Sequence, residues 1–274
     1  MPDPYWTSDD GNVVLYLGDY RDVLPGLGLQ PDLIVVDPPY GETDLAWDRW
    51  PDGWPGFVAE HTTARSMWCF GSLGMFLDHI TEIRAAGWKR SQDIVGREDD
   101  GTPVISDVNV VWEKHNGSGN ATDRFRRVHE HAVLFYRGPW AETHHDTPLT
   151  EATPAQIKRN GSAVRTTQPQ HTGTYGPARR WTETGTRLMR SVIQVPSMKG
   201  RAIHETEKPV QLIDPLIRYS CPPDGLVFDP MAGSGAVLDA ARQAGRRSVG
   251  IERQERYAEA AATRLASQLA LEFT

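Results

Sequence analysis

Short apolar runs recur along the chain, each followed by polar or glycine-bearing residues. They predict strands, because short apolar and β-branched runs bounded by turn residues are typical of buried strands. The run at residues 33–36 has no polar member, which indicates a strand covered on both faces of a parallel sheet. The other predicted strands are residues 13–17, 66–70, 108–112, 131–136, 226–228 and 248–251.

Helical spacing fills several of the intervals between these runs. One amphipathic pattern ends at Gly87, a residue suited to closing a helix. Another is expected to be interrupted at Asp214-Pro215, since proline removes a helical hydrogen bond. The predicted helices are residues 75–86, 209–219, 235–244 and 254–271. Strands that alternate with helices favour an α/β fold on a mostly parallel sheet.

Some stretches lack clear periodicity. Residues 42–56 are rich in tryptophan, proline and aspartate and predict a loop, and residues 114–127 are polar. From residue 138 to about residue 200, Gly, Pro, Thr, Gln and Arg dominate, so only short turns or strands are expected. A segment this long without regular structure is usually a functional insertion or disordered.

Composition bounds the class of protein. A chain of 274 residues can form one large α/β domain with an insertion, or two small domains. No stretch is long and apolar enough to span a bilayer, and residues 1–4 lack the features of a signal peptide. Cys69 and Cys221 have no metal or redox spacing and fit buried thiols. A reduced, cytoplasmic protein is expected.

The charge is distributed unevenly. The chain has a net charge of −7, yet residues 151–203 hold nine basic and two acidic residues, a local net charge of +7. The rest of the chain therefore carries −14. The local excess favours a polyanion that docks on this segment, and the alternative is a solvated basic surface.

The motif Asp37-Pro38-Pro39-Tyr40 directly follows the buried run at residues 33–36. A carboxylate, two conformationally fixed prolines and an aromatic ring thus lie where a central strand is predicted to end. In open α/β sheets, ligands bind at the carboxyl ends of the strands. We therefore expect this motif to carry chemistry.

A second motif, Asp229-Pro230-Met231-Ala232-Gly233-Ser234-Gly235, joins a predicted strand to a predicted helix. Its glycines let the backbone approach a ligand, and the helix start offers free N–H groups. Glu252 follows the next strand, where an acid grips the hydroxyl groups of a ribose. Together they favour nucleoside binding over a simple tight turn. A dinucleotide fits less well, since the Gly-x-Gly-x-x-Gly pattern is incomplete.

Together these motifs resemble those of the S-adenosylmethionine-dependent DNA amino-methyltransferases, which methylate adenine N6 or cytosine N4. The catalytic motif comes first, the basic segment next and the cofactor motif last, an order that resembles the permuted β group of the family. Thr206-Glu207-Lys208-Pro209 resembles the motif that flanks the cofactor site. Residues 110–114 and 126–130 resemble the segments between the catalytic motif and the recognition region. The likeness covers nearly the whole chain outside about residues 140–195.

The resemblance implies a Rossmann-like, mostly parallel sheet that is circularly permuted and carries a variable target-recognition insertion. Residues 1–138 would form the catalytic half, residues 139–200 the insertion and residues 201–274 the cofactor-binding half. The implied cofactor is S-adenosylmethionine, with S-adenosylhomocysteine as product. Double-stranded DNA is the implied partner, and a second copy of the chain or a restriction endonuclease are further candidate partners.

The resemblance also implies a mechanism. The Asp37 carboxylate and the Pro38 carbonyl accept the two hydrogens of an exocyclic amine, which aims the lone pair of its nitrogen at the methyl group. Pro38 and Pro39 fix the carbonyls in place. Tyr40 stacks on the target base, which has left the duplex because its amine is otherwise paired. No metal is required.

On the cofactor side, Asp229 and the backbone of residues 232–235 would hold the amino acid end, and Glu252 the ribose. The topology would bring Asp19 to the adenine amine and Tyr20 to its ring; the alternative for Asp19 is a turn or helix cap. The expected cofactor-binding residues are Asp19, Tyr20, Thr206, Lys208, Pro209, Asp229, Pro230, Met231, Ala232, Gly233, Ser234, Gly235 and Glu252. The expected DNA-binding residues are Arg159, Arg165, Arg179, Arg180, Arg187, Arg190 and Lys199.

Other activities compete with adenine-N6 transfer. Asp37 at the head of the catalytic motif favours adenine, since the cytosine-N4 enzymes of the family more often begin with Ser. Methylation of a protein glutamine amide is a further alternative, but that family usually begins the motif with Asn and lacks a basic insertion. A catalytically idle DNA-binding module would not need Asp37 and Glu252 intact.

Two further features have ordinary explanations. His129 and His131 share a strand face without zinc-enzyme spacing, so we expect no metal site there. The tryptophans of the predicted loop form either a mobile flap over the target base or a hydrophobic cover; they are Trp47, Trp50 and Trp54.

Overall fold

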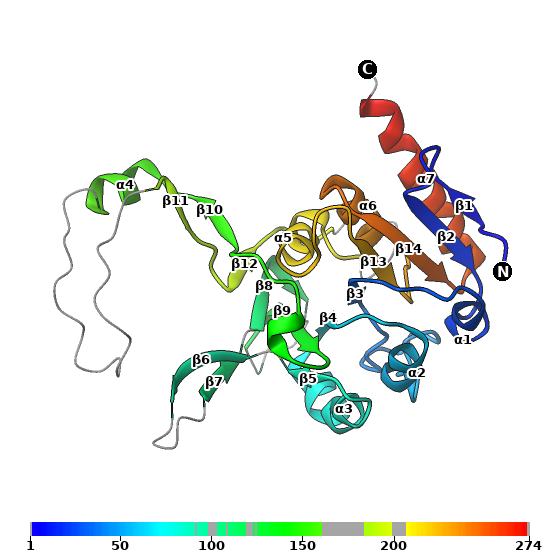
Figure 1. Ribbon diagram of the computed structural model, residues 1–274, viewed down its shortest axis with the longest axis horizontal. Coiled ribbons are helices and arrows are strands. Elements are labelled where there is room, and N and C mark those ends of the chain that lie inside the picture. The colour runs from blue at the N-terminus through cyan, green and yellow to red at the C-terminus, as the bar shows by residue number, and fades with distance from the viewer. Residues whose placement is uncertain are drawn as a thin grey trace.

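The computed structural model describes residues 2–90, 92–97, 103–107, 109–118, 123, 125–160, 184–198 and 207–272. Its centre is a ten-stranded sheet in the order β1-β2-β14-β13-β3-β4-β9-β8-β12, with β5 paired to β9. Helices cover both faces of this sheet (Figure 1). The predicted α/β fold with a mostly parallel sheet is confirmed, whereas the circular permutation stays an interpretation of the motif order.

The parallel core of the sheet consists of β2, β14, β13, β3 and β4. β1, β9 and β5 pair antiparallel with their neighbours, as do β8 and β9, and β12 runs parallel to β8. The strands of the main sheet are β1 (Trp6–Thr7), β2 (Val13–Leu17), β3 (Leu33–Val36), β4 (Ser66–Gly71), β5 (Lys89–Arg90), β8 (Asn109–Ser118), β9 (Arg127–Tyr136), β12 (Val192–Gln194), β13 (Leu226–Asp229) and β14 (Arg247–Glu252). Two small sheets are formed by β6 (Gln92–Arg97) with β7 (Pro103–Asp107) and by β10 (Leu149–Glu151) with β11 (Thr186–Leu188).

Alternate side chains of β3 show how the layers form. Leu33 and Val35 belong to one core with α5, α6 and α7, while Ile34 and Val36 belong to a second core with α1, α2 and α3. Burial on both faces explains the wholly apolar sequence of this strand. The helices are α1 (Tyr20–Val23), α2 (Trp54–His61), α3 (Leu73–Ala85), α4 (Pro154–Asn160), α5 (Val210–Ser220), α6 (Ala236–Gln243) and α7 (Glu255–Glu272), with short 3₁₀ turns at Leu24–Gly26 and Trp140–Glu142.

Strands from opposite parts of the chain meet in the middle of the sheet. β13 lies between β14 and β3, with Phe228 in register with Ile34. Both strands run in the same direction, so the residues that follow them lie at one edge of the sheet. The expectation that the strands before Asp37 and Asp229 are neighbours is confirmed.

The observed elements correct several predictions. α5 is continuous through Pro215, because its apolar face, including Leu212 and Leu216, is buried and offsets the lost hydrogen bond. α2 begins inside the predicted loop at residues 42–56, with Trp54 fully buried. α4 interrupts a stretch expected to lack helices. β8 and β9 extend into the polar stretch at residues 114–127, because cross-strand pairing outweighs its composition.

Other predictions are confirmed. The other predicted strands and helices lie within two residues of their predicted bounds, whereas β1, β5, β6, β7 and α1 were not predicted. Cys69 and Cys221 are buried free thiols. In the part of the chain that the structure describes, no helix has both the length and the apolar character needed to cross a membrane.

Candidate functional site

A cavity of about 730 Å³ lies at the carboxyl ends of β3, β13 and β14. Its walls bring together the two motifs, which are almost 200 residues apart in sequence but follow neighbouring strands. The expected site residues that line it are Asp19, Tyr20, Asp37, Pro38, Pro39, Tyr40, Lys208, Asp229, Pro230, Met231, Ala232, Gly233, Ser234 and Glu252. Gly235 and Pro209 are not in the lining but directly precede α6 and α5 as their N-caps. Thr206 lies outside the described residues.

Both oxygens of the Asp37 carboxylate have a donor. The Tyr40 hydroxyl donates to Oδ1 at 2.6 Å, and the Lys208 ammonium donates to Oδ2 at 2.5 Å. The Lys208 side chain is 4% exposed. Lys208 therefore lies on the side of the catalytic motif, although its motif was expected to flank the cofactor.

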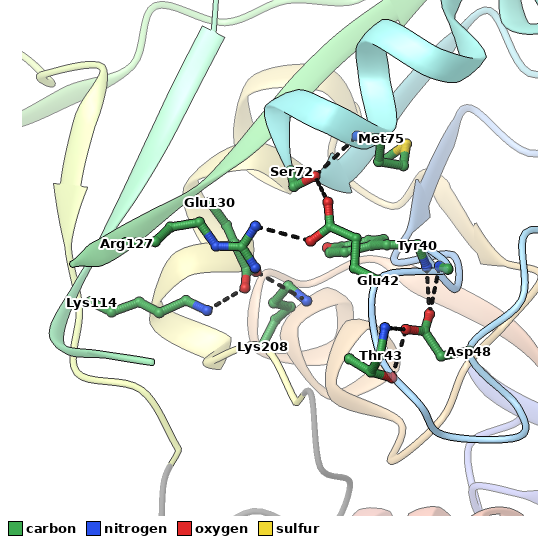
Figure 2. Close-up of polar contacts among 11 residues, drawn as sticks. Tyr40, Glu42, Thr43, Asp48, Ser72, Met75, Lys114, Arg127, Glu130 and Lys208 are labelled. Carbon is green, nitrogen blue, oxygen red and sulfur yellow. Dashed lines mark hydrogen bonds and ion pairs between the residues drawn. The ribbon is translucent and has the colours of Figure 1, made fainter. Parts of the chain in front are cut away.

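Lys208 also belongs to a chain of alternating charges that runs from Asp37 through Lys208 and Glu130 to Lys114. Figure 2 shows the last three of these residues. The Nζ of Lys208 is 3.4 Å from Glu130, which forms a second ion pair with Lys114. Burial alone would lower the pKa of Lys208, but the carboxylates of Asp37 and Glu130 raise it above its usual value. Burial alone would raise the pKa of Glu130, but the two ammonium groups hold it below its usual value. Lys208 and Glu130 thus stay charged at neutral pH.

The carboxyl groups of the second motif have a different environment. Asp229 is 3% exposed and accepts a hydrogen bond from the Met231 N–H at 3.0 Å. Burial raises the pKa of Asp229 to about 8. Glu252 accepts hydrogen bonds from the N–H groups of Gly233 and Gln254, and burial raises its pKa as well. Neither carboxyl group forms an ion pair with a residue that the structure describes.

The glycine-rich turn packs closely on the last helix. Gly235 has φ +74°, and a Cβ atom there would meet the Ala261 Cβ at 3.1 Å. Glycine is therefore favoured both by the left-handed backbone and by the contact with α7. Residues 229–234 of the turn line the cavity, and a close approach of its backbone to a ligand stays a prediction.

Asp19 and Tyr20 lie at the start of α1. The Asp19 side chain accepts a hydrogen bond from the Arg21 N–H at 2.9 Å, so the helix-cap alternative is confirmed. Asp19 also lines the cavity, which leaves a contact with a ligand as a prediction. Tyr20 is 6% exposed, and burial raises its pKa to about 12.

The loop after the catalytic motif is held at several points. The Trp50 ring donates to Glu82 at 2.8 Å and stacks on His79 with ring centroids 3.9 Å apart. Glu42 accepts from the Ser72 hydroxyl and from Arg127, as Figure 2 shows. These contacts and the burial of Trp54 favour a hydrophobic cover over a mobile flap for this loop.

The expected DNA-binding residues are only partly described. Arg187 is in β11 and Arg190 follows it, and neither is among the residues that line the cavity. The others lie outside the described residues or in a part of α4 whose side chains are not described: Arg159, Arg165, Arg179, Arg180 and Lys199. In the described ranges no group of three or more His, Cys, Asp or Glu side chains could hold a metal ion.

Sequence reasoning assigned no role to three buried or partly buried charged residues of this site. Lys114 of β8 forms an ion pair with Glu130 of the neighbouring strand β9, and Asp48 lies in the predicted loop. Lys114 and Glu130 fell in segments that resemble the family, but their pairing depends on strand register. The burial of Asp48 could not be predicted, because the composition of residues 42–56 predicts only a loop.

Comparisons with known proteins indicate the family and the fold. The sequence profile of a family described as DNA methylase, N6_N4_Mtase, matches residues 31–263. The type II methyltransferase M.ScaI of Streptomyces caespitosus is 26% identical over 97% of this chain and 84% of its own length. The putative methylase YubD of Escherichia coli strain K12 is 48% identical over 68 residues, which span 25% of this chain and 30% of YubD. Of these two relatives, M.ScaI is similar to this chain over nearly its whole length, whereas YubD is similar over one segment.

A solved structure shares the fold. The crystal structure of the M1.HpyAVI–SAM complex superposes with a TM-score of 0.56 at 19% identity, covering 92% of this chain and 99% of that one. At this level of identity the likeness concerns the arrangement of helices and strands.

Proposed function

The chain belongs to the N6_N4_Mtase family of DNA methylases, which use S-adenosylmethionine, and from this premise we propose that it methylates the N6 amine of adenine at a specific site in double-stranded DNA. The observation that carries the proposal is the cavity at the ends of β3 and β13. It is lined both by Asp37, whose carboxylate is held by two hydrogen bonds, and by the glycine-rich turn. S-adenosylmethionine supplies an electrophilic methyl group.

The catalytic motif acts on the amine of the target base. That nitrogen is a poor nucleophile because its lone pair is conjugated with the ring. The Asp37 carboxylate and the Pro38 carbonyl accept its two hydrogens and direct the lone pair toward the methyl carbon. Tyr40 and Lys208 support this role, since their hydrogen bonds fix the Asp37 carboxylate before the base arrives.

The Tyr40 ring stacks on the extruded base. Its hydroxyl is bound to Asp37, so the ring and the carboxylate form one unit. An aromatic face suits any base, while the carboxylate selects an amine.

The second motif holds the cofactor. Asp229 and the N–H groups of the glycine-rich turn bind its amino acid end, and Glu252 binds the ribose hydroxyls. The fit is supported by two buried carboxyl groups with raised pKa values, because a cationic ligand stabilises their ionised forms. Asp19 and Tyr20 contact the adenine.

Residues 139–200 act as the target-recognition segment of this proposal. Their basic excess suits phosphate contacts, which position DNA without reading its sequence. Asp37 at the head of the motif favours adenine over cytosine. A homodimer and a restriction partner stay predictions from the resemblance.

The test is to incubate the protein with unmethylated DNA and labelled cofactor, digest the DNA to nucleosides and identify the product by mass spectrometry. N6-methyladenine supports the proposal, and N4-methylcytosine replaces it with the cytosine alternative. Asp37→Ala should lower transfer at least about 1,000-fold, since it removes the charged acceptor, and should leave cofactor binding within a few-fold of normal. Undiminished transfer by this variant would rule out the mechanism.

A further inference from the structure

Asp48 is a buried carboxylate in a loop whose neighbouring residues are mostly exposed. The residue is 3% exposed. Its Oδ1 accepts hydrogen bonds from the N–H groups of Tyr40 and Gly41 at 2.7 and 2.9 Å. Its Oδ2 accepts from the N–H and the hydroxyl of Thr43, both at 2.7 Å. Four donors therefore converge on one side chain (Figure 2).

The backbone is shaped to meet this anion. Gly41 has φ +73°, a left-handed conformation that favours glycine. Such a residue turns successive N–H groups toward the same side, where they form a concave site for a negative charge. Asp48 fills that site from within the protein.

The charge of Asp48 is held in place by these donors. Burial alone would raise the pKa of its carboxyl group, but the hydrogen bonds from Thr43, Gly41 and Tyr40 hold it below the usual value. The side chain is thus a carboxylate at neutral pH. An amide in its place would turn one donor group toward existing donors.

We propose that Asp48 is a positioning residue for methyl transfer that acts through Tyr40. It fixes the peptide N–H of Tyr40, and the hydroxyl of the same residue donates to Asp37 at 2.6 Å. Tyr40 is thereby held at its backbone by Asp48 and at its hydroxyl by Asp37, which fixes both the stacking ring and the catalytic carboxylate. This inference rests on the proposed methyltransferase function.

The rest of the loop does not depend on Asp48. Glu82 accepts hydrogen bonds from the Trp50 ring and from the Gly53 N–H, at 2.8 and 2.6 Å. Glu42 is tied to Ser72 and to Arg127. Trp54 is fully buried at the start of α2. The loop should therefore keep its overall path without Asp48, while the turn at residues 40–43 loses its anchor.

The test compares Asp48→Asn with Asp44→Asn, which makes the same change of charge at an exposed position of the same loop. Single-turnover methyl transfer is measured at saturating DNA and cofactor, cofactor affinity by calorimetry, and Tm by thermal unfolding. Asp48→Asn should transfer about 10 to 100 times more slowly than Asp44→Asn, the range expected when a reacting group is displaced by up to about 1 Å. Its cofactor Kd should match that of the control, and its Tm should be lower by only a few degrees, the effect of about 1 kcal/mol in a chain of this size.

Equal transfer rates for the two variants would overturn the inference. So would a joint fall of rate, cofactor affinity and Tm in Asp48→Asn, because that pattern describes a fold-stabilising residue. If the wild type and Asp44→Asn both fail to methylate DNA, the proposed function itself is wrong.

A double-mutant cycle with Tyr40→Phe tests the route through Tyr40. That variant removes the hydroxyl link to Asp37, so Asp48→Asn should slow transfer less in its background than in the wild type. Fully additive effects on the rate would show that Asp48 does not act through this hydroxyl.

Discussion

β3 and β13 are parallel neighbours; Asp37 directly follows β3 and Asp229 ends β13, yet the two carboxyl groups lie in opposite electrostatic settings. Asp37 contacts the Lys208 ammonium and the Tyr40 hydroxyl. Asp229 is buried with a backbone N–H as donor, and its pKa is raised to about 8. At the same edge of the sheet, Asp37 thus has a cationic partner from the protein, whereas Asp229 has only a backbone N–H.

Under the proposed function, the difference indicates where each half would obtain its positive charge. On the proposed catalytic side the protein contributes the cation itself, so the Asp37 carboxylate is preorganised for a neutral base. On the proposed cofactor side the balancing charge would come from the ligand, whose sulfonium and amino groups are cationic. A neutral or singly charged analogue should therefore bind poorly, even if its shape fits.

Among the changes that test this comparison, the largest expected effect comes from removing the Lys208 ammonium. Lys208→Met leaves Asp37 and Glu130 without their shared ammonium, so the Asp37 carboxylate loses its fixed geometry. Transfer at saturating substrates should fall about 100- to 1,000-fold, as when a preorganised electrostatic group is removed. The free energy of unfolding should fall by about 3 kcal/mol or more, since a buried ion pair is broken on one side. Rapid-quench transfer assays and denaturant unfolding measure both.

Lys114→Met is the matched control for this change. Lys114 pairs with Glu130 and not with Asp37, so it disturbs the same charge chain at a greater distance from the Asp37 carboxylate. Its rate should fall much less than that of Lys208→Met. Equal losses would mean that the whole charge chain, rather than the contact with Asp37, supports transfer.

The second expected effect is a loss of cofactor affinity. Glu252→Ala removes the proposed ribose contact and frees the N–H groups of Gly233 and Gln254. Cofactor Kd should rise about 10- to 100-fold, the value of a hydrogen bond to a charged group. The transfer rate at saturating cofactor should change only a few-fold. Calorimetry with Glu255→Ala as control, an exposed acid at the start of α7, decides; an unchanged Kd rejects the ribose assignment.

The smallest expected effect is a pH dependence of cofactor affinity that arises from Asp229. With its pKa at about 8, Asp229 is mostly protonated at pH 7 before the cofactor binds. A cationic ligand favours the ionised form, so binding releases a proton and affinity rises with pH. Between about pH 6 and 7.5 the gain should approach tenfold per unit. It should level off as the pH passes the pKa.

Calorimetry in buffers of different ionisation enthalpy counts the released protons. Asp229→Asn is the control, because it removes this titration and keeps that of the ligand amine. A pH profile identical in both proteins would show that Asp229 does not ionise on binding.

The sequence predicted the central strands and both motifs because these depend on local patterns. The apolar run of β3 and the glycine-rich turn at residues 229–235 can each be predicted from only a few consecutive residues. Their adjacency followed from a general rule, that parallel strands end at one edge of the sheet.

The sequence could not predict contacts that depend on tertiary structure. The pairing of Lys208 with Asp37 joins residues from opposite ends of the chain. Asp48 resembled any polar loop residue, since its burial arises only when the turn at residues 40–43 closes over it. Pro215 followed the local rule for breaking a helix, and the packing of α5 overrode that rule. The recognition role of Arg179 and Arg180 stays a prediction outside the described residues.

The position of β13 and β14 between β2 and β3 has a consequence for the newly made chain. A ribosome releases β2 and β3 long before the two strands that separate them. Until those strands are made, the early strands have unpaired edges, which other chains or chaperones can contact. The cavity, and any activity toward DNA, therefore arises only after β13 and β14 have been made.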